Sequence, residues 1–194
     1  MVILFTGNGK GKTTASLGQM VRAAGRGKNA LMIQFIKGPW ISGEDEFAKK
    51  HEARNPSAEG GSALGGKSET NEQNPKLEIR KMGRGFVGIL GDKLPREEHA
   101  KAAQEGLALF REEAKSGKWF LIALDEVNVA VSLGLLTKEE VLEAIKDYPE
   151  DKLLILSGRG APQEFIDRAD LATEMKEIKH PFNQGEKAKI AVEF

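Results

Sequence analysis

Short apolar runs alternate with amphipathic segments along most of this chain. A nearly continuous apolar run bounded by turn residues is typical of a buried strand. This pattern predicts strands over residues 2–5, 30–36, 119–124 and 153–156. Two further strands are predicted, an alternating one at 77–81 and an edge strand at 171–175.

Helices are predicted between these strands, over residues 12–24, 44–50, 95–116, 137–147 and 162–168. In the first of them one face is expected to carry Leu17, Met20, Val21 and Ala24. Proline or threonine opens the last three, as expected for helix starts. The alternation of strand and helix predicts an α/β fold, a mostly parallel sheet with helices on both faces.

Residues 51–76 differ in composition from the rest. They are rich in Gly, Ser, Asn and Glu and contain no Val, Ile, Phe or Tyr. Such a segment has too little apolar surface to order itself. We interpret it as a flexible surface insertion in a single domain spanning residues 1–194. The alternative is a lid that becomes ordered when a ligand binds.

The overall composition excludes several kinds of site. Lys+Arg and Asp+Glu number 29 each, so no net charge attracts nucleic acid or a membrane surface. The absence of Cys excludes disulfides, thiolate metal sites and cysteine nucleophiles. The start of the chain lacks the pattern of a signal peptide, and no apolar stretch approaches the ~20 residues that cross a bilayer. We expect a cytoplasmic protein with neither nucleic-acid nor membrane partners.

The most informative segment is residues 2–14, an apolar run, a glycine-rich turn and then a helix start. This order is the architecture that binds phosphates through backbone N–H groups. Lys12 is expected to reach the outer phosphates, and the Thr13 hydroxyl to bind Mg²⁺. Thr6 stands where the usual motif has glycine. The alternative is a glycine- and lysine-rich turn without a ligand. The expected contacts are Gly7, Asn8, Gly9, Lys10, Gly11, Lys12, Thr13 and Thr14.

A second polar group follows the apolar run at 120–124, which ends in Asp125 and Glu126. In phosphate-loop proteins an acid at this place holds Mg²⁺ directly or through water. Neighbouring residues on a strand point to opposite faces. One acid alone therefore faces the metal, unless the strand ends at Asp125. A simple helix cap is the alternative reading of the pair.

Three more polar residues are candidates for ligand contacts. Asn128 is either a ligand contact or a helix-end cap. Arg159 and Lys37 each follow a predicted strand, where they either grip a phosphate or carboxylate or lie solvated in a turn. The chain's three histidines are scattered, and their spacing assigns none to a metal site.

Taken together, the motifs form an ordered set that resembles the corrinoid adenosyltransferases of the P-loop type. The set runs nearly end to end, apart from residues 51–76. It comprises residues 6–14, 34–40 with Gly43 and Glu44, 124–128, 134–136, 157–162, 169–175 and 178–182.

The resemblance implies a P-loop NTPase (RecA-like) fold and transfer of the 5′-deoxyadenosyl group of ATP to a Co(I) corrinoid, with release of triphosphate. It implies Mg²⁺ or Mn²⁺ with Thr13, Asp125 and Glu126 as ligands. Lys12, Thr13 and Glu126 are the implied catalytic residues. A homodimer and a reductase that supplies Co(I) are further implications.

One loop departs from the family pattern. The family has Gly-x-Gly-Phe-Thr-Trp where residues 83–88 here read Gly-Arg-Gly-Phe-Val-Gly. Phe86 keeps its place and is expected on the corrin side. Gly88 replaces the tryptophan, so either space is left beneath the corrin ring or Ile89, Leu90 or Trp40 fills it. The alternatives for function are a diverged P-loop ATPase and a corrinoid-binding chaperone that does not transfer the adenosyl group.

Overall fold

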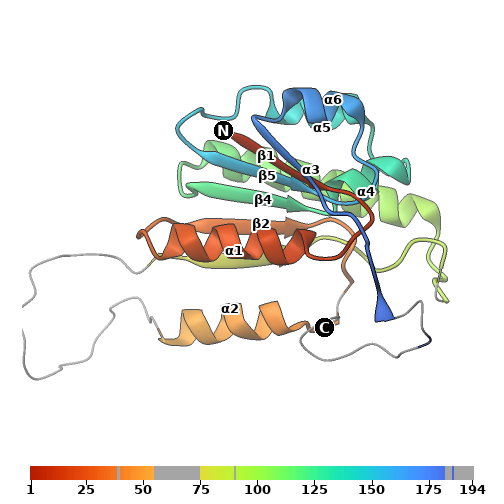
Figure 1. The fold of residues 1–194 in the computed structure, drawn as a ribbon, viewed down its shortest axis with the longest axis horizontal. Coiled ribbons are helices and arrows are strands. Elements are labelled where there is room, and N and C mark those ends of the chain that lie inside the picture. The colour runs from red at the N-terminus through yellow and green to blue at the C-terminus, as the bar shows by residue number, and fades with distance from the viewer. Residues whose placement is uncertain (39, 55–74, 90, 182–184, 186–194) are drawn as a thin grey trace, which may run out of the picture.

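A six-stranded, all-parallel sheet forms the centre of the computed structural model, which describes residues 1–38, 40–54, 75–89, 91–181 and 185 (Figure 1). The order across the sheet is β3-β2-β4-β5-β1-β6. The strands are β1 (Val2–Thr6), β2 (Ala30–Gln34), β3 (Leu77–Lys81), β4 (Leu121–Asp125), β5 (Leu153–Ser157) and β6 (Leu171–Glu174). The helices are α1 (Lys12–Ala24), α2 (Gly43–Arg54), α3 (Arg96–Lys115), α4 (Val127–Ser132), α5 (Lys138–Ile145) and α6 (Gln163–Arg168).

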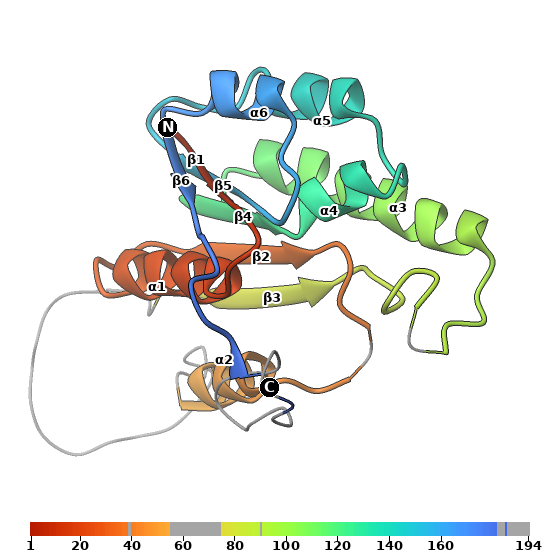
Figure 2. The same cartoon turned by 45° about the vertical axis from the view of Figure 1, so that its right-hand side comes forward.

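Helices cover both faces of this sheet, as predicted (Figure 2). Alternate residues of each strand point to opposite faces. In β1, Val2 and Leu4 pack with residues of α3, α4, α5 and α6, whereas Ile3 and Phe5 pack with residues of α1. Each of the four central strands is therefore apolar up to its last residue, which is polar, because both faces of the strand are buried.

Several element boundaries differ from the prediction. β2 ends at Gln34, and β4 extends to include Asp125. α2 continues to Arg54, so it enters the predicted insertion, whose residues 55–74 lie outside the described part of the chain. α4 was not predicted, because its alternating valines locally favour a strand. The tertiary contacts of Val127 and Ala130, both fully buried, override that preference.

The buried face of α1 agrees with the predicted one only in part, since Met20 is buried and Leu17 packs against the core as predicted. Lys12, Ser16, Met20 and Ala23 are buried, whereas Val21 is 51% exposed. Lys12 and Ser16 can be buried on this face because backbone carbonyl oxygens accept hydrogen bonds from their side chains. The Ser16 hydroxyl donates to the Lys12 carbonyl at 3.1 Å.

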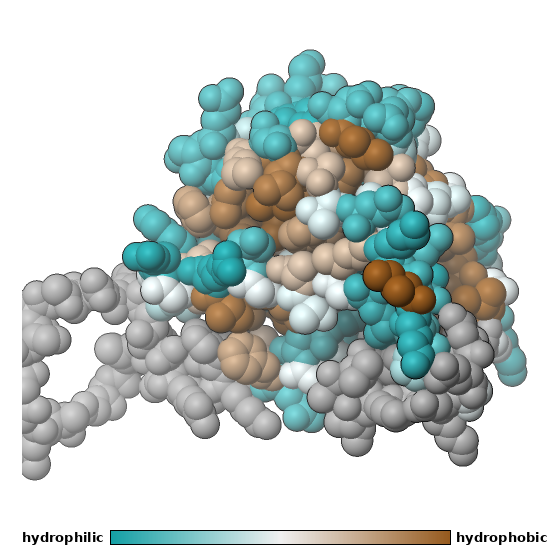
Figure 3. Space-filling model, viewed as in Figure 1, coloured by the Kyte–Doolittle hydropathy of each residue, from teal (hydrophilic) through white to brown (hydrophobic). Residues whose placement is uncertain are grey.

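The two edges of the sheet are β3 and β6. Every residue of β6 is exposed, and Figure 3 shows apolar surface in this part of the molecule. No helix among the described residues is long and apolar enough to cross a bilayer. Because all strands are parallel, their carboxyl ends meet at one end of the sheet, the end to which the arrows point in Figure 1. This end is where open α/β sheets bind ligands.

Candidate active site

The loop between β1 and α1 closes around the side chain of Lys12. Its ammonium donates to the carbonyl oxygens of Gly7 at 2.8 Å and Gly9 at 2.7 Å. Gly7 and Gly11 have φ of 93° and 106°, a backbone conformation that favours glycine. Burial lowers the pKa of Lys12, which is 5% exposed. The loop thus presents one buried cation at the N-terminus of a helix, the arrangement that binds anions.

The chain after β6 packs against this loop and forms backbone hydrogen bonds with it. The Gly9 N–H donates to the Met175 carbonyl at 2.6 Å, and the Met175 N–H donates to the Thr6 carbonyl at 2.8 Å. A Cβ atom on Gly7 would lie 2.5 Å from the Met175 carbonyl oxygen. The glycines at 7 and 9 therefore serve close backbone packing. Local sequence carries no signal for this contact, because the partner lies far along the chain.

Asp125, the last residue of β4, lies directly beneath the start of α1. Its carboxylate accepts hydrogen bonds from the Thr13 hydroxyl at 3.0 and 3.3 Å, the Ser157 hydroxyl at 2.6 Å and the Gln34 amide at 3.3 Å. Burial raises the pKa of this fully buried carboxyl, and the hydrogen bonds oppose that shift. The Thr13 contact brings this acid to the start of α1, although β5 lies between β4 and β1 in the sheet, and its role as a magnesium ligand stays a prediction.

Glu126 turns toward the same region as Asp125 because the strand ends between them. Its φ of 62° and ψ of 22° are left-handed, and no other described residue except glycines has a positive φ. Its N–H donates to the Ser157 hydroxyl at 3.1 Å. Burial, followed by the charge of Asp125, raises the pKa of Glu126 to about 6. Strained backbone of this kind costs about 1–3 kcal/mol and is concentrated at functional sites.

Ser157 joins the two acids, and sequence reasoning did not assign it a role. Its hydroxyl donates to Asp125 and accepts from the Glu126 N–H. The available signal was its place at the end of a buried strand, directly before the Gly-Arg-Gly turn at 158–160. Gln34, at the end of β2, belonged to the motif at 34–40, but its contact with Asp125 was not predicted.

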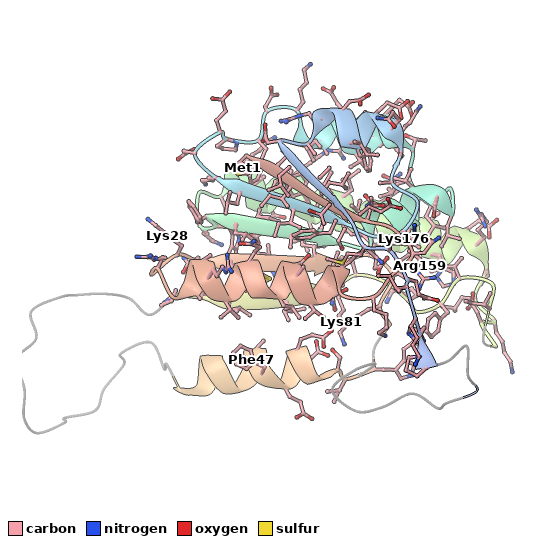
Figure 4. The ribbon with its side chains drawn as sticks, viewed as in Figure 1. Met1, Lys28, Phe47, Lys81, Arg159 and Lys176 are labelled. Carbon is pink, nitrogen blue, oxygen red and sulfur yellow. The ribbon has the colours of Figure 1, made fainter. Side chains whose placement is uncertain are left out.

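The other predicted ligand contacts lie around this centre and differ in how far they are exposed to solvent. Lys37 pairs with Glu44 at the start of α2, and its charge also acts on both acids. Arg159 is exposed, and its charge acts on Lys12 and Glu126. Figure 4 places Arg159 at the carboxyl end of the sheet, with Lys28 at the opposite end. Asn8, Lys10 and Thr14 are exposed on the loop and the first turn of α1.

Asn128 does not cap a helix, so that interpretation is wrong. Glu126 occupies the N-cap position of α4, and Asn128 lies inside the helix. Its amide donates to the Gly158 carbonyl at 3.0 Å, which ties α4 to the turn after β5. Its side-chain oxygen is buried without a partner. The ligand-contact interpretation stays a prediction.

The donor atoms at this centre fit Mg²⁺, which prefers hard oxygen ligands. The Thr13 hydroxyl and two carboxylates supply such oxygens, and the buried side-chain oxygen of Gln34 has no partner. No cluster of three or more acidic or histidine side chains that could hold a metal occurs among the described residues. A magnesium ion here would depend on phosphate oxygens and water for its remaining ligands, as is usual for this ion.

The loop after β3 carries Phe86, which is 48% exposed. Its ring centroid lies 6.1 Å from that of Trp40, with the ring planes tilted by 34°. A Cβ atom on Gly88 would meet nothing within 4 Å, so space is open at that position. Three residues were expected as candidates to fill the space that Gly88 leaves. Of these, Trp40 contacts Phe86, and Ile89 is 58% exposed. Leu90 lies outside the described residues.

Comparisons with known proteins agree on one family. A family model described as ATP:corrinoid adenosyltransferase BtuR/CobO/CobP matches residues 1–194. The chain is 31% identical over 194 residues to a corrinoid adenosyltransferase of Escherichia coli strain K12, covering 100% of this chain and 85% of that one. It is also 31% identical over 195 residues to the corrinoid adenosyltransferase CobA of Salmonella typhimurium, with the same coverage. A corrinoid adenosyltransferase of Sinorhizobium sp is 33% identical over 196 residues, covering 100% of this chain and 80% of that one.

Proposed function

Because the chain belongs to the ATP:corrinoid adenosyltransferase family, we propose that its phosphate loop binds the triphosphate of ATP for transfer of the adenosyl group to a reduced corrinoid. This proposal rests on the position of a lysine next to a carboxylate. A buried lysine inside a glycine loop lies beside a carboxylate that is hydrogen-bonded to the first turn of the following helix.

The reaction makes one bond and breaks one. The electron pair of Co(I) attacks the 5′ carbon of the ribose, the cobalt–carbon bond forms, and the C5′–O bond breaks. Triphosphate departs with the electron pair of that bond. No proton transfer is needed at the reacting atoms, so the protein contributes positioning and stabilisation of the leaving charge.

Lys12 and the loop amides stabilise that charge. The ammonium of Lys12 is already held by the Gly7 and Gly9 carbonyls, so little reorganisation is needed to meet a phosphate oxygen. Lys10 and Arg159 add cations at the exposed rim, where they neutralise the outer phosphates. Asn8, Gly11 and Thr14 complete the loop around the triphosphate.

Thr13, Asp125 and Glu126 are the residues that would hold Mg²⁺. The bound ion would neutralise charge on the triphosphate. Asp125 is fully buried and orients the Thr13 hydroxyl by accepting a hydrogen bond from it, which leaves the lone pairs of the hydroxyl oxygen for the metal. Ser157 and Gln34 in turn hold the Asp125 carboxylate. Lys37 and Asn128 are proposed contacts to the nucleotide at the same edge.

The corrinoid is proposed to bind on the side of Phe86, at the carboxyl ends of β2 and β3. The proposal includes a separate reductase that supplies the Co(I) state. The proposal includes a homodimer in the cytoplasm.

An anaerobic assay with ATP, Mg²⁺ and chemically reduced cobalamin tests the function. The spectrum of the light-sensitive adenosyl product is followed while triphosphate is measured separately. Lys12→Ala is expected to lower the rate by about a hundredfold or more, because it removes one donor to the leaving group. Lys146→Ala, at a side chain that is 65% exposed at the end of α5, is the matched control.

The products that appear distinguish the three possible functions. Equal amounts of adenosylcobalamin and triphosphate support the transferase. Phosphate in place of triphosphate indicates an ATPase. A corrinoid spectral change without triphosphate indicates a carrier. Full activity of Lys12→Ala contradicts the role of the loop.

A further inference from the structure

Two aromatic side chains lie together on the surface at the carboxyl end of the sheet. Trp40 is 63% exposed and follows β2, and Phe86 is 48% exposed and follows β3. Their centroids are 6.1 Å apart. Ile41, next to Trp40 in the sequence, and Ile89, three residues after Phe86, are 68% and 58% exposed. Clustered exposed apolar side chains of this kind mark binding surfaces.

The indole of Trp40 lies against the backbone of two glycines. A Cβ atom on Gly38 would lie 2.7 Å from Cζ3 of the indole, and one on Gly85 would lie 2.9 Å from Cη2. Any side chain at either position would displace the ring. One side of the indole is thus packed on backbone while most of the ring's surface is open.

Hydrogen bonds to Lys81 and Asp45 hold the segment that carries Trp40 in place. Lys81, at the end of β3, donates to the Trp40 carbonyl and to the Asp45 carboxylate. The same oxygen of Asp45 accepts from the Ser42 N–H and hydroxyl, each at 2.7 Å. Figure 4 shows Lys81 between the sheet and α2. The position of Trp40 is therefore set by the fold.

The loop that carries Phe86 is held by a second set of bonds. The Asp92 carboxylate accepts from the Gly88 N–H at 2.8 Å and from the Leu94 N–H at 3.0 Å. The His99 ring at the start of α3 lies 3.0 Å from the same carboxylate. Both rings of the pair are thus supported by anchored backbone.

We propose that Trp40 is a corrinoid-positioning residue, forming with Phe86 the apolar surface on which the corrin ring packs. This inference rests on the proposed function. Two adjacent rings from separate segments match a large flat macrocycle better than a single purine base, which one ring covers. The loop that carries Phe86 begins beside the phosphate-binding side, because the Gly83 N–H donates to the Gln34 carbonyl at 3.1 Å and the Gln34 amide donates to Asp125 at 3.3 Å.

Steady-state kinetics of Trp40→Ala and Trp40→Phe test the proposal. Trp40→Ala is expected to raise the KM for the corrinoid about tenfold, which is about 1.4 kcal/mol, while the KM for ATP changes less than about twofold. Trp40→Phe is expected to recover most of the loss because it restores a ring. Phe47→Ala, which removes a ring of similar exposure (51%) on α2, is the control.

Two corrinoid probes and a double variant sharpen the result. Because the contact is to the ring, cobalamin and cobinamide, which lacks the lower base, are expected to show the same rise in KM. Trp40→Ala combined with Phe86→Ala is expected to lose less than the product of the two single losses, because the two rings form one surface.

Other results overturn the inference while the proposed function stands. A wild-type enzyme that transfers the adenosyl group, with no change of corrinoid KM in Trp40→Ala, excludes the contact. A rise in the KM for ATP alone assigns the indole to adenine. A change in sedimentation at constant KM assigns the surface to a second copy of the chain. If the wild type itself makes no adenosyl product, the proposed function fails first.

Discussion

Replacing Gly9 with alanine tests the contact between the phosphate loop and the chain after β6. The new Cβ atom would lie 2.7 Å from the Met175 carbonyl oxygen, 2.8 Å from the Lys176 carbonyl carbon and 3.0 Å from the Glu177 nitrogen. All three neighbours are backbone atoms, so no side-chain rotation relieves the contact. Either the loop or the segment at 175–177 must move.

The size of the effect follows from two losses. Overpacking of this kind costs about 1–3 kcal/mol. The hydrogen bond from the Gly9 N–H to the Met175 carbonyl, 2.6 Å long, contributes about 1 kcal/mol more if it is disrupted. A loss of about 2–4 kcal/mol in the free energy of unfolding lowers Tm by roughly 4–16 °C in a chain of this size. The KM for ATP is expected to rise as well, because the loop amides move.

Gly18→Ala is the matched control, since it makes the same chemical change within α1. A Cβ atom there would meet nothing within 4 Å. Alanine is a better helix former than glycine, so we expect a gain of about 1 kcal/mol. Thermal unfolding of both variants is followed by circular dichroism, and ATP kinetics are measured in parallel. Wild-type Tm and wild-type KM for ATP in Gly9→Ala would refute the packing argument.

Two further substitutions test buried carboxylates. Because the pKa of Glu126 rises from 4.5 to about 6 on folding, its ionised form costs the folded state about 2 kcal/mol. Glu126→Gln is therefore expected to raise Tm at about pH 8, a gain that disappears as the pH falls through about 6 to 4.5. It is also expected to lower transferase activity, and an unchanged Tm at about pH 8 would contradict the burial cost. Glu113 accepts from the Trp119 indole and the Arg80 guanidinium, each at 2.6 Å. Burial by itself would raise the pKa of Glu113, but these two hydrogen bonds hold that pKa below its ordinary value. Glu113→Gln is expected to lose about 1–3 kcal/mol near neutral pH, measured by urea unfolding. This deficit narrows as the pH falls below about 4.5 and through the lowered pKa of the folded carboxyl, because the wild-type side chain then loses its charge. A deficit independent of pH would show that the charge plays no part.

Local sequence determined the elements and much of the site. Apolar runs and helix signals placed six strands and five helices in order, because burial on both faces of a parallel sheet leaves a continuous apolar run. The loop at 7–11 and its Lys12 were evident from spacing alone, since a glycine turn before a helix is a local feature. Thr137 was likewise evident as a helix start, and it forms a capping box with Glu140.

Tertiary structure alone decided which distant residues meet. The Thr13 hydroxyl reaches Asp125, Ser157 joins both acids, Met175 supports Gly9, and Trp40 contacts Phe86. Each contact joins residues at or after the carboxyl ends of different strands, and no local pattern encodes which strand ends become neighbours.

The turn of Glu126 into the left-handed region has the same origin. A strand pattern predicts that adjacent acids point apart, whereas the buried Ser157 hydroxyl and the packing of α4 hold them together. Sequence determined the chemical groups and the order of the elements in this protein. Because contacts across the sheet depend on the packing of the whole chain, the arrangement of those groups around one centre was decided only by the fold.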